Sequence, residues 1–206
     1  MESESWAGAR RAFEQAAAWF VRTAAAGPGR WDETALGEWT VRDLVGHTSR
    51  ALLTVESYLG QQAVSVDVGS PLDYFGAMSA STGDPAAVAQ RGRDAGAALG
   101  ADVPAAVAEI ADRVVPRIDT ESADALVATP VGGMRLSDYL PTRTFELTVH
   151  TCDLAVALDQ PLDVPEAAAV ESLTLLAGLA ARRADVGALL LAATGRRGLP
   201  PGFTVL

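Results

Sequence analysis

His47 and His150 are the only two histidines in this chain of 206 residues. Glu146 precedes His150 by four positions and Asp153 follows it by three, so a helix would place these three side chains on one side. A carboxylate and an imidazole one helical turn apart can bind one divalent cation together. With His47 from a second helix, Glu146 and His150 would form a three-ligand set suited to zinc, leaving a fourth position open for water or substrate.

The position of this group on its predicted helix, residues 138–158, is unusual. At about 100° per residue, Glu146, His150 and Asp153 run down the middle of a broad apolar arc, and three threonines form a thin polar side. The middle of such an arc should face the core, where a carboxylate needs a partner. A divalent metal is one such partner, and a hydrogen-bonded Glu–His pair without metal is the alternative.

Asp153 and two arginines are further candidates for chemistry. Asp153 could orient a metal-bound His150 from outside the ligand set, or it could be a surface acid that faces an arginine. Arg143 and Arg135 could bind an anionic substrate, although surface ion pairs are the commoner role of arginine.

Cysteine and tryptophan give weaker signals. Cys152 points away from Glu146 and is expected to be a small buried hydrophobe, because a reactive thiol needs an electropositive setting. Trp31 and Trp39 are expected to pack over one end of the fold, and a role in a pocket wall is an alternative that has no specific support. No phosphate loop, dinucleotide fingerprint or nucleophile elbow is present.

An alanine- and leucine-rich composition with few β-branched runs favours helices around these residues. A capping box of Thr40 and Asp43 predicts one helix start. Ser137 predicts a second start, and Asp84 followed by Pro85 predicts a third. Helices are expected over residues 5–25, 41–59, 85–118 with an interruption near 100–104, 138–158, 166–183 and 186–193, with an irregular segment at 60–70 and a turn or short hairpin at 129–133.

Composition bounds the class of protein. The chain has 16 basic residues, all arginine, against 26 acidic ones, which gives a net charge of −10 and makes nucleic acid an improbable partner. A single cysteine excludes an intramolecular disulfide framework. The apolar runs are too short to span a bilayer and the acidic start is unlike a signal peptide, so a cytoplasmic protein is expected. Length and the lack of a linker predict one domain, residues 1–206, in an all-α helical bundle.

Two segments resemble a known family. Residues 36–47, LGEWTVRDLVGH, resemble the GWTVRDLxxH segment of the mycothiol-dependent maleylpyruvate isomerase family, which is part of the DinB-like metal-binding bundles. Residues 140–153, LPTRTFELTVHTCD, resemble its second segment, RxxExxxHxxD. The tail segments at 190–196 and 199–203 are also similar to those of short family members.

This resemblance implies a DinB-like four-helix bundle with short extra helices and a zinc ion held by His47, Glu146 and His150. It also implies mycothiol as the thiol cosubstrate and a small electrophilic substrate, with Asp153 and Arg143 in catalytic roles. Mycothiol occurs in GC-rich actinobacteria, which agrees with the absence of lysine and asparagine from the chain.

The well-known isomerase has a second, smaller C-terminal domain that contributes to its active site, and little of this chain follows residue 183. A related thiol-dependent isomerase or transferase is therefore expected rather than maleylpyruvate isomerisation itself. Two alternatives remain open: a hydrolase that uses zinc-bound water, and a non-enzymatic binding protein whose metal only locks the bundle. An exposed helix face could also support a homodimer.

Overall fold

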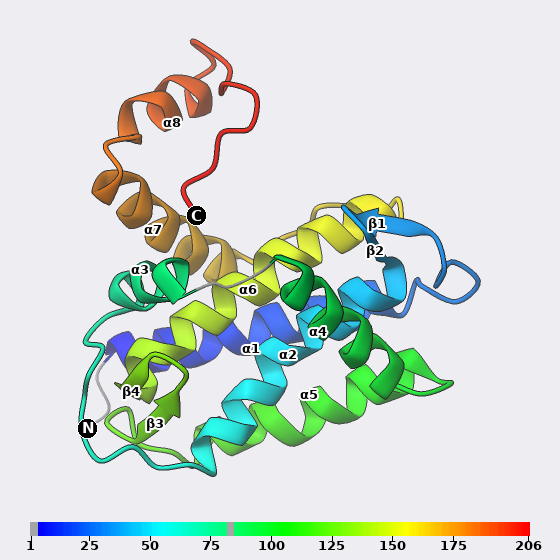
Figure 1. Cartoon of the computed structure of the whole chain (residues 1–206), viewed down its shortest axis with the longest axis horizontal. Coiled ribbons are helices and arrows are strands. Elements are labelled where there is room, and N and C mark those ends of the chain that lie inside the picture. Colours follow the sequence, from blue (N-terminus) through cyan, green and yellow to red (C-terminus); the bar gives the residue numbers. More distant parts are fainter. Residues whose placement is uncertain (1–3, 82–84) are drawn as a thin grey trace.

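The computed structural model describes residues 4–81 and 85–206, and within them helices and two short antiparallel strand pairs (Figure 1). This confirms the expected all-α class. The helices are α1 (Glu4–Ala24), α2 (Val41–Leu59), α3 (Pro71–Ser81), α4 (Pro85–Ala98), α5 (Val103–Asp119), α6 (Leu136–Ala157), α7 (Glu166–Arg182) and α8 (Val186–Ala193). The strands are β1 (Thr34–Leu36), β2 (Trp39–Thr40), β3 (Leu126–Thr129) and β4 (Gly132–Arg135).

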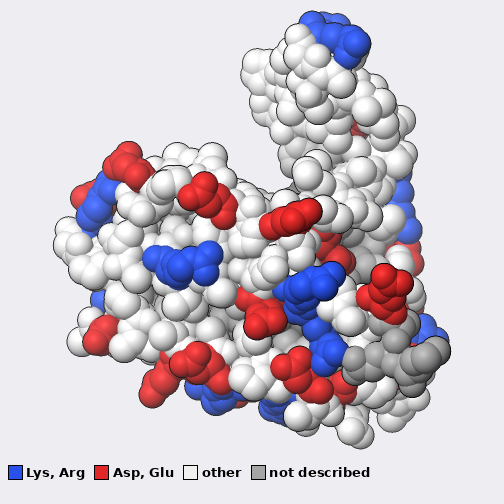
Figure 2. Space-filling model, turned by 180° about the vertical axis from the view of Figure 1, so that it is seen from behind, with Lys and Arg blue, Asp and Glu red and all other residues white. Residues whose placement is uncertain are grey.

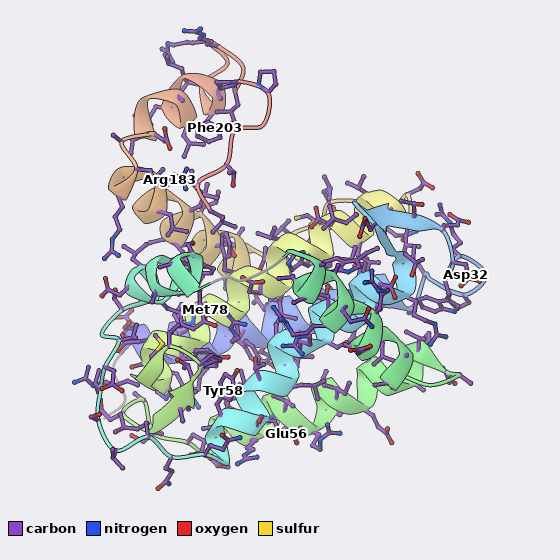
Figure 3. The ribbon with its side chains drawn as sticks, viewed as in Figure 1. Asp32, Glu56, Tyr58, Met78, Arg183 and Phe203 are labelled. Atoms are coloured by element: carbon purple, nitrogen blue, oxygen red, sulfur yellow. The ribbon has the colours of Figure 1, made fainter. Side chains whose placement is uncertain are left out.

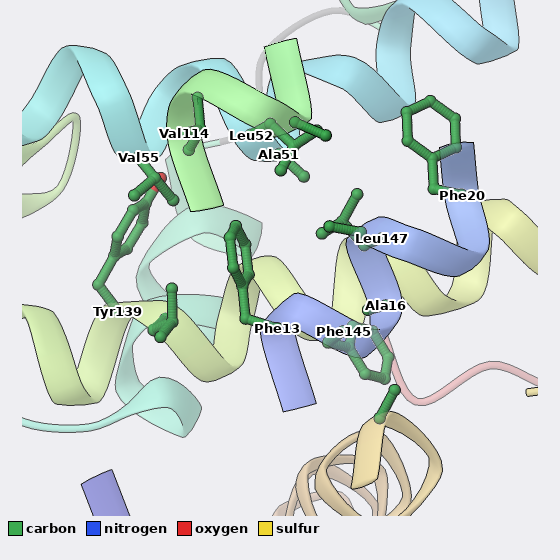
Figure 4. Close-up of a cluster of buried hydrophobic side chains, with 14 of the residues drawn as sticks. Phe13, Ala16, Phe20, Ala51, Leu52, Val55, Val114, Tyr139, Phe145 and Leu147 are labelled. Atoms are coloured by element: carbon green, nitrogen blue, oxygen red, sulfur yellow. The ribbon is translucent and has the colours of Figure 1, made fainter. Parts of the chain in front are cut away.

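Helices α1, α2, α5 and α6 form the bundle, because α1 and α2 each pack against both α5 and α6. Their large apolar side chains point toward one another in the centre (Figure 4). The buried set includes Phe13 and Phe20 from α1, Leu52 from α2, Val114 from α5 and Leu147 from α6. Removing this apolar surface from water is the main force that holds the four helices together.

Helix α6 is enclosed by α1, α2, α3 and α7. Its threonine side is therefore buried as well: Thr144, Thr148 and Thr151 are each at most 5 % exposed. The Thr148 hydroxyl donates to the Thr144 carbonyl at 2.7 Å, and the Thr144 hydroxyl donates to the carbonyl of Leu140 at 3.3 Å. A threonine that satisfies its hydroxyl on its own helix can be packed against a neighbour.

Helix α2 begins at the predicted capping box. The Thr40 hydroxyl accepts from the Asp43 amide at 3.2 Å, and the Asp43 carboxylate accepts from the Thr40 amide at 3.0 Å. Glycines then bring α4 close to α2, since a Cβ on Gly46 would lie 2.1 Å from the Gly96 nitrogen. This contact places α4 beside the face of α2 that carries His47.

Helix α6 does not begin at the predicted cap. Its N-cap residue is Arg135 rather than Ser137, and no side chain caps the helix. Instead, the amide of Leu136 donates to the Ala125 carbonyl at 2.8 Å, and that of Ser137 donates to the Ala123 carbonyl at 3.0 Å. The chain that leads into β3 thus supplies acceptors for the first free amides, and a side-chain cap is not needed.

The predicted turn at 129–133 is a hairpin of β3 and β4, with Thr129 opposite Gly132. The irregular segment 60–70 crosses this hairpin: the amide of Asp67 donates to the Gly133 carbonyl, and the Asp67 carboxylate accepts from the Gly133 amide, both at 2.8 Å. A Cβ at position 133 would lie 2.0 Å from the Ser65 carbonyl oxygen, so only glycine permits this approach.

Helix α3 is not among the elements predicted from the sequence. Its start carries a usable signal, because the Ser70 hydroxyl accepts from the Asp73 amide at 3.1 Å and Pro71 is the first helical residue. The predicted interruption near residue 100 is confirmed, since α4 ends at Ala98 and α5 begins at Val103. The predicted cap at Asp84 lies outside the described residues.

Residues 183–206, called the arm below, lead away from the bundle through α8 and return to it at the end of the chain (Figure 1), where Val205 is buried. Helix α7 packs on α1 and α6, whereas α8 packs against α7 and buries none of its residues. Basic side chains gather at the tip of the arm, while acidic ones are scattered over the body (Figure 2). Over the described part of the chain, no helix combines the length and the apolarity that a membrane crossing requires.

Candidate metal centre

The structure brings together the three side chains proposed as ligands. His47 comes from the middle of α2, and Glu146 and His150 come from the middle of α6. One potential ligand atom from each residue lies within 4.8 Å of the other two. The two imidazole rings lie edge to face, with centroids 4.8 Å apart and an interplanar angle of 90°.

His150 lies between two carboxylates of its own helix. Its Nε2 is 3.4 Å from a Glu146 oxygen, and its Nδ1 is 3.1 Å from an Asp153 oxygen. Burial opposes a charged ring, but the hydrogen bonds to Asp153 and Glu146 outweigh it and raise the pKa of His150 to about 9. Without a metal, His150 is therefore protonated at neutral pH.

Glu146 is held in its charged form. Burial alone would raise its pKa, but the hydrogen bond from His150 and the nearby charge of Arg143 lower the pKa of Glu146 to about 2. Its side chain is 25 % exposed and faces a cavity rather than the dry core that the helical arc predicts. Access to that cavity explains how a carboxylate can occupy the middle of an apolar arc.

His47 has the opposite surroundings. Its ring packs against the Trp39 indole with centroids 4.4 Å apart, and a hydrogen bond from Trp39 Nε1 to the Ala89 carbonyl fixes the indole. Burial, followed by the positive charge of His150, lowers the pKa of His47 to about 4, so the ring is neutral at pH 7. Its Nδ1 is buried and has no hydrogen-bond partner among the described residues.

These features fit a divalent metal. Two imidazoles and one carboxylate are a donor set typical of zinc with an open position. A neutral His47 with an unpartnered nitrogen has a lone pair to offer a cation. His150 donates through Nδ1 to Asp153, which is the arrangement that commonly orients a metal-bound histidine. The proton on His150 supplies the positive charge that a cation would supply at this position.

A cavity of about 610 Å³ opens beside the three side chains. Tyr58 on α2 and Met78 on α3 line it and are labelled in Figure 3. The remaining lining comes from α2 (His47, Thr48, Arg50, Ala51, Thr54), α3 (Tyr74, Phe75, Ser79), α4 (Val88, Arg91), the hairpin (Pro130), α6 (Arg143, Glu146, His150) and the tail (Leu206). The volume is sufficient for a small substrate.

Arg143 lies in the wall of this cavity and is 9 % exposed. Its guanidinium carbon lies 5.1 Å from the Tyr139 ring centroid and 5.3 Å from that of Tyr74, and it donates to the Tyr74 hydroxyl at 3.3 Å. No carboxylate of a described residue forms an ion pair with it. A buried guanidinium held between two aromatic rings is positioned to bind an anion that enters the cavity.

The other predicted residues have different surroundings. Asp153 contacts His150 but is not part of the cavity lining. Arg135 lies away from the cavity, 3.6 Å from Asp124 and 3.7 Å from Asp138. Cys152 is half-buried and also outside the lining, and burial raises the pKa of its thiol.

Sequence reasoning missed one complete wall of the cavity. Tyr74, Phe75 and Met78 come from α3, whose start signal lies in the preceding Ser70 and Pro71. Trp39 was expected mainly to pack over one end of the fold, and its direct contact with His47 was not predicted. A Cβ on Gly92 of α4 would lie 2.6 Å from the indole, so this glycine makes room for Trp39.

Comparison with known families gives a match that covers most of the chain. A family model described as the mycothiol maleylpyruvate isomerase N-terminal domain matches residues 10–155. The match includes α2 and nearly all of α6, and therefore all three candidate ligands, and it ends before α7 and the arm. Neither the curated proteins nor the solved structures contain a significant match.

Proposed function

The chain belongs to the mycothiol maleylpyruvate isomerase N-terminal domain family, and from this premise we propose that it is a zinc-dependent, thiol-using isomerase or transferase. His47, Glu146 and His150 would hold the metal, and mycothiol would be the thiol cosubstrate. The observation that carries the proposal is the convergence of these side chains at the wall of an open cavity. A metal that only locked the bundle would need no such access.

When bound, zinc supplies a cation that stabilises a thiolate at neutral pH. The Asp153 carboxylate accepts the Nδ1–H of His150, which leaves Nε2, on the Glu146 side, as the nitrogen available to a metal. Because Asp153 lies outside the cavity lining, we assign it a positioning role rather than contact with substrate.

Arg143 would bind a carboxylate or another anionic group of the substrate. Its charge lies near Glu146, so a bound anion would be held close to the metal centre. The Tyr74 hydroxyl accepts a hydrogen bond from Arg143 and also lines the cavity. Burial raises the pKa of Tyr74, so this hydroxyl stays protonated and can donate a hydrogen bond to a substrate oxygen.

We also propose that α7 belongs to the same domain as the residues matched by the family model, because it packs on α1 and α6 of the bundle. Buried Ala168 and Ala180 contribute to the common core. Val205 near the end of the chain joins the same core, which supports the single domain expected over residues 1–206.

Metal analysis combined with thiol binding tests the proposal. Purified protein is expected to contain about one zinc per chain. Mycothiol should raise the melting temperature of the zinc-loaded protein, whereas 2-mercaptoethanol at the same concentration should not. His47→Ala should remove both the zinc and the response to mycothiol.

Each negative result has a separate meaning. Zinc-loaded protein that ignores mycothiol would contradict thiol use and favour the hydrolase alternative. Protein that keeps its fold but binds no metal would contradict the metal centre itself. Protein that unfolds on chelation, and whose zinc no added thiol can reach, would favour a structural metal.

A further inference from the structure

Three arginines line the cavity: Arg50 from α2, Arg91 from α4 and Arg143 from α6. Among the described lining residues, Glu146 supplies the only side-chain carboxylate. The chain as a whole carries a net charge of −10. Leu206, which also lines the cavity, adds the carboxylate at the end of the chain, but the three arginines still outnumber the carboxylates. The cavity wall therefore has the opposite sign to the protein, and it attracts anions that the rest of the surface repels.

Arg50 and Arg91 differ from many arginines elsewhere in the structure. Arg30, Arg113 and Arg182, for example, each hold a carboxylate at 2.7–3.0 Å. The guanidinium groups of Arg50 and Arg91, in contrast, make no hydrogen bond or ion pair with any described residue. Their planar sets of N–H donors remain available to a carboxylate or a phosphate.

The positions of the three arginines give the cavity an inner and an outer part. Arg143 is buried between aromatic rings, Arg50 is half-buried, and Arg91 is exposed. Arg50 follows His47 by three residues and so lies on the same side of α2. Arg50 and Arg91 come from neighbouring helices that pack at Gly46 and Gly96.

We propose that Arg50 and Arg91 form an outer anion subsite, which binds a carboxylate or phosphate at the end of the substrate remote from Arg143. A ligand with two anionic groups can then occupy both subsites at once. This inference rests on the proposed function only in taking the cavity as the substrate site. It assigns a specificity role to two residues that are not metal ligands.

Calorimetric titration of the chelator-treated full chain tests this subsite without relying on metal or activity. The probes are succinate, with two carboxylates, acetate, with one, and inorganic phosphate. We expect succinate to bind more tightly than acetate. Arg50→Gln and Arg91→Gln should each weaken succinate binding about tenfold and leave acetate binding unchanged, because acetate can still use Arg143.

Arg11→Gln is the matched control, since Arg11 is exposed on α1, outside the cavity lining, and the variant loses the same charge. It should bind succinate like the unmodified protein. Circular dichroism of each variant verifies the fold. Phosphate that competes with succinate, and loses this ability in Arg91→Gln, would show that the subsite also accepts phosphate.

Three results would overturn the subsite: no succinate binding by folded protein, unchanged binding by both cavity variants, or an equal loss in Arg11→Gln. A failed metal analysis would leave this experiment intact, because the subsite is measured without metal. Conversely, unchanged succinate binding by the cavity variants would refute the subsite but would leave the proposed zinc centre standing.

Discussion

The metal centre has two sides, called the α2 wall, which carries His47, and the α6 wall, which carries Glu146 and His150. The two walls hold their histidines by different means. On α6, His150 is oriented by Glu146 and Asp153, which lie within one turn of it on the same helix. On α2, His47 has no such partner and is held by packing against Trp39. One wall is therefore built from spacing within one helix. The other depends on a ring contact with a residue just before α2, whose indole is held by the distant α4.

The difference extends to charge. The two carboxylates raise the pKa of His150 to about 9, whereas burial lowers that of His47 to about 4. In the absence of metal, the two rings thus differ by a full charge at pH 7 although their centroids are 4.8 Å apart. The comparison indicates that α6 supplies the electrostatics of the site and α2 supplies its shape.

Removing either histidine gives the largest expected effect. His47→Ala and His150→Ala should each lower zinc affinity by more than the ~10–100-fold that loss of an outer-shell partner costs. Metal analysis of the purified variants measures this. Cys152→Ala, on α6 beside the site, should retain its zinc, and zinc retained in either histidine variant would refute the ligand assignment.

Removing the indole tests whether packing maintains the α2 wall. Trp39→Ala deletes a side chain that is 9 % exposed, and it should lower the free energy of unfolding by ~3–5 kcal/mol. Urea titration measures this loss. Trp31→Ala, at a more exposed position, should lose less, and an equal loss in both variants would contradict the special role of Trp39. Trp39→Phe provides a folded variant if alanine is not tolerated.

Removing the outer carboxylate weakens the α6 wall without touching a ligand. Asp153→Asn should reduce zinc affinity ~10–100-fold, because the neutral amide no longer orients and polarises His150. Competition with a chromophoric chelator measures the affinity. The exposed Asp112→Asn removes the same charge from α5 and should have no effect. Unchanged affinity in Asp153→Asn would assign Asp153 to the surface alone.

The smallest effect is on the pH dependence of stability of the metal-free protein. The pKa of His47 is lower in the folded than in the unfolded chain, so its contribution is lost as pH falls from about 6.5 toward 4. The pKa of His150 is raised, so its contribution is lost as pH rises from about 6.5 toward 9. The combined contribution of His47 and His150 to the free energy of unfolding should therefore be greatest near pH 6.5.

Nuclear magnetic resonance can follow both groups separately, since the chain has only two histidines. The His47 signal should titrate well below pH 6.5 and the His150 signal well above it. In Asp153→Asn, the His150 midpoint should move down while that of His47 stays nearly constant. Two signals that titrate together near pH 6.5 would contradict the comparison between the walls.

Local sequence was sufficient for most of the helices and for one side of the site. The Thr40–Asp43 capping box and the spacing of Glu146, His150 and Asp153 involve interactions within one turn, so they could be predicted. Ser137 was wrongly predicted as a cap because the acceptors for the first α6 amides come from residues before the hairpin. That contact depends on how the chain returns, which helix propensity does not describe.

By itself, the sequence determined the all-α class and the alignment of Glu146, His150 and Asp153 on one side of α6. It also determined the family resemblance, which the family match confirmed. Only the tertiary structure decided that His47 lies beside Glu146 and His150 and that Trp39 packs against His47. It also decided that Arg50 and Arg91 line the same cavity as these residues. The physical reason is the separation along the chain of the residues that interact. Hydrogen bonds within a turn follow from spacing along the chain, whereas cavities and ring contacts depend on how separate helices pack across the core.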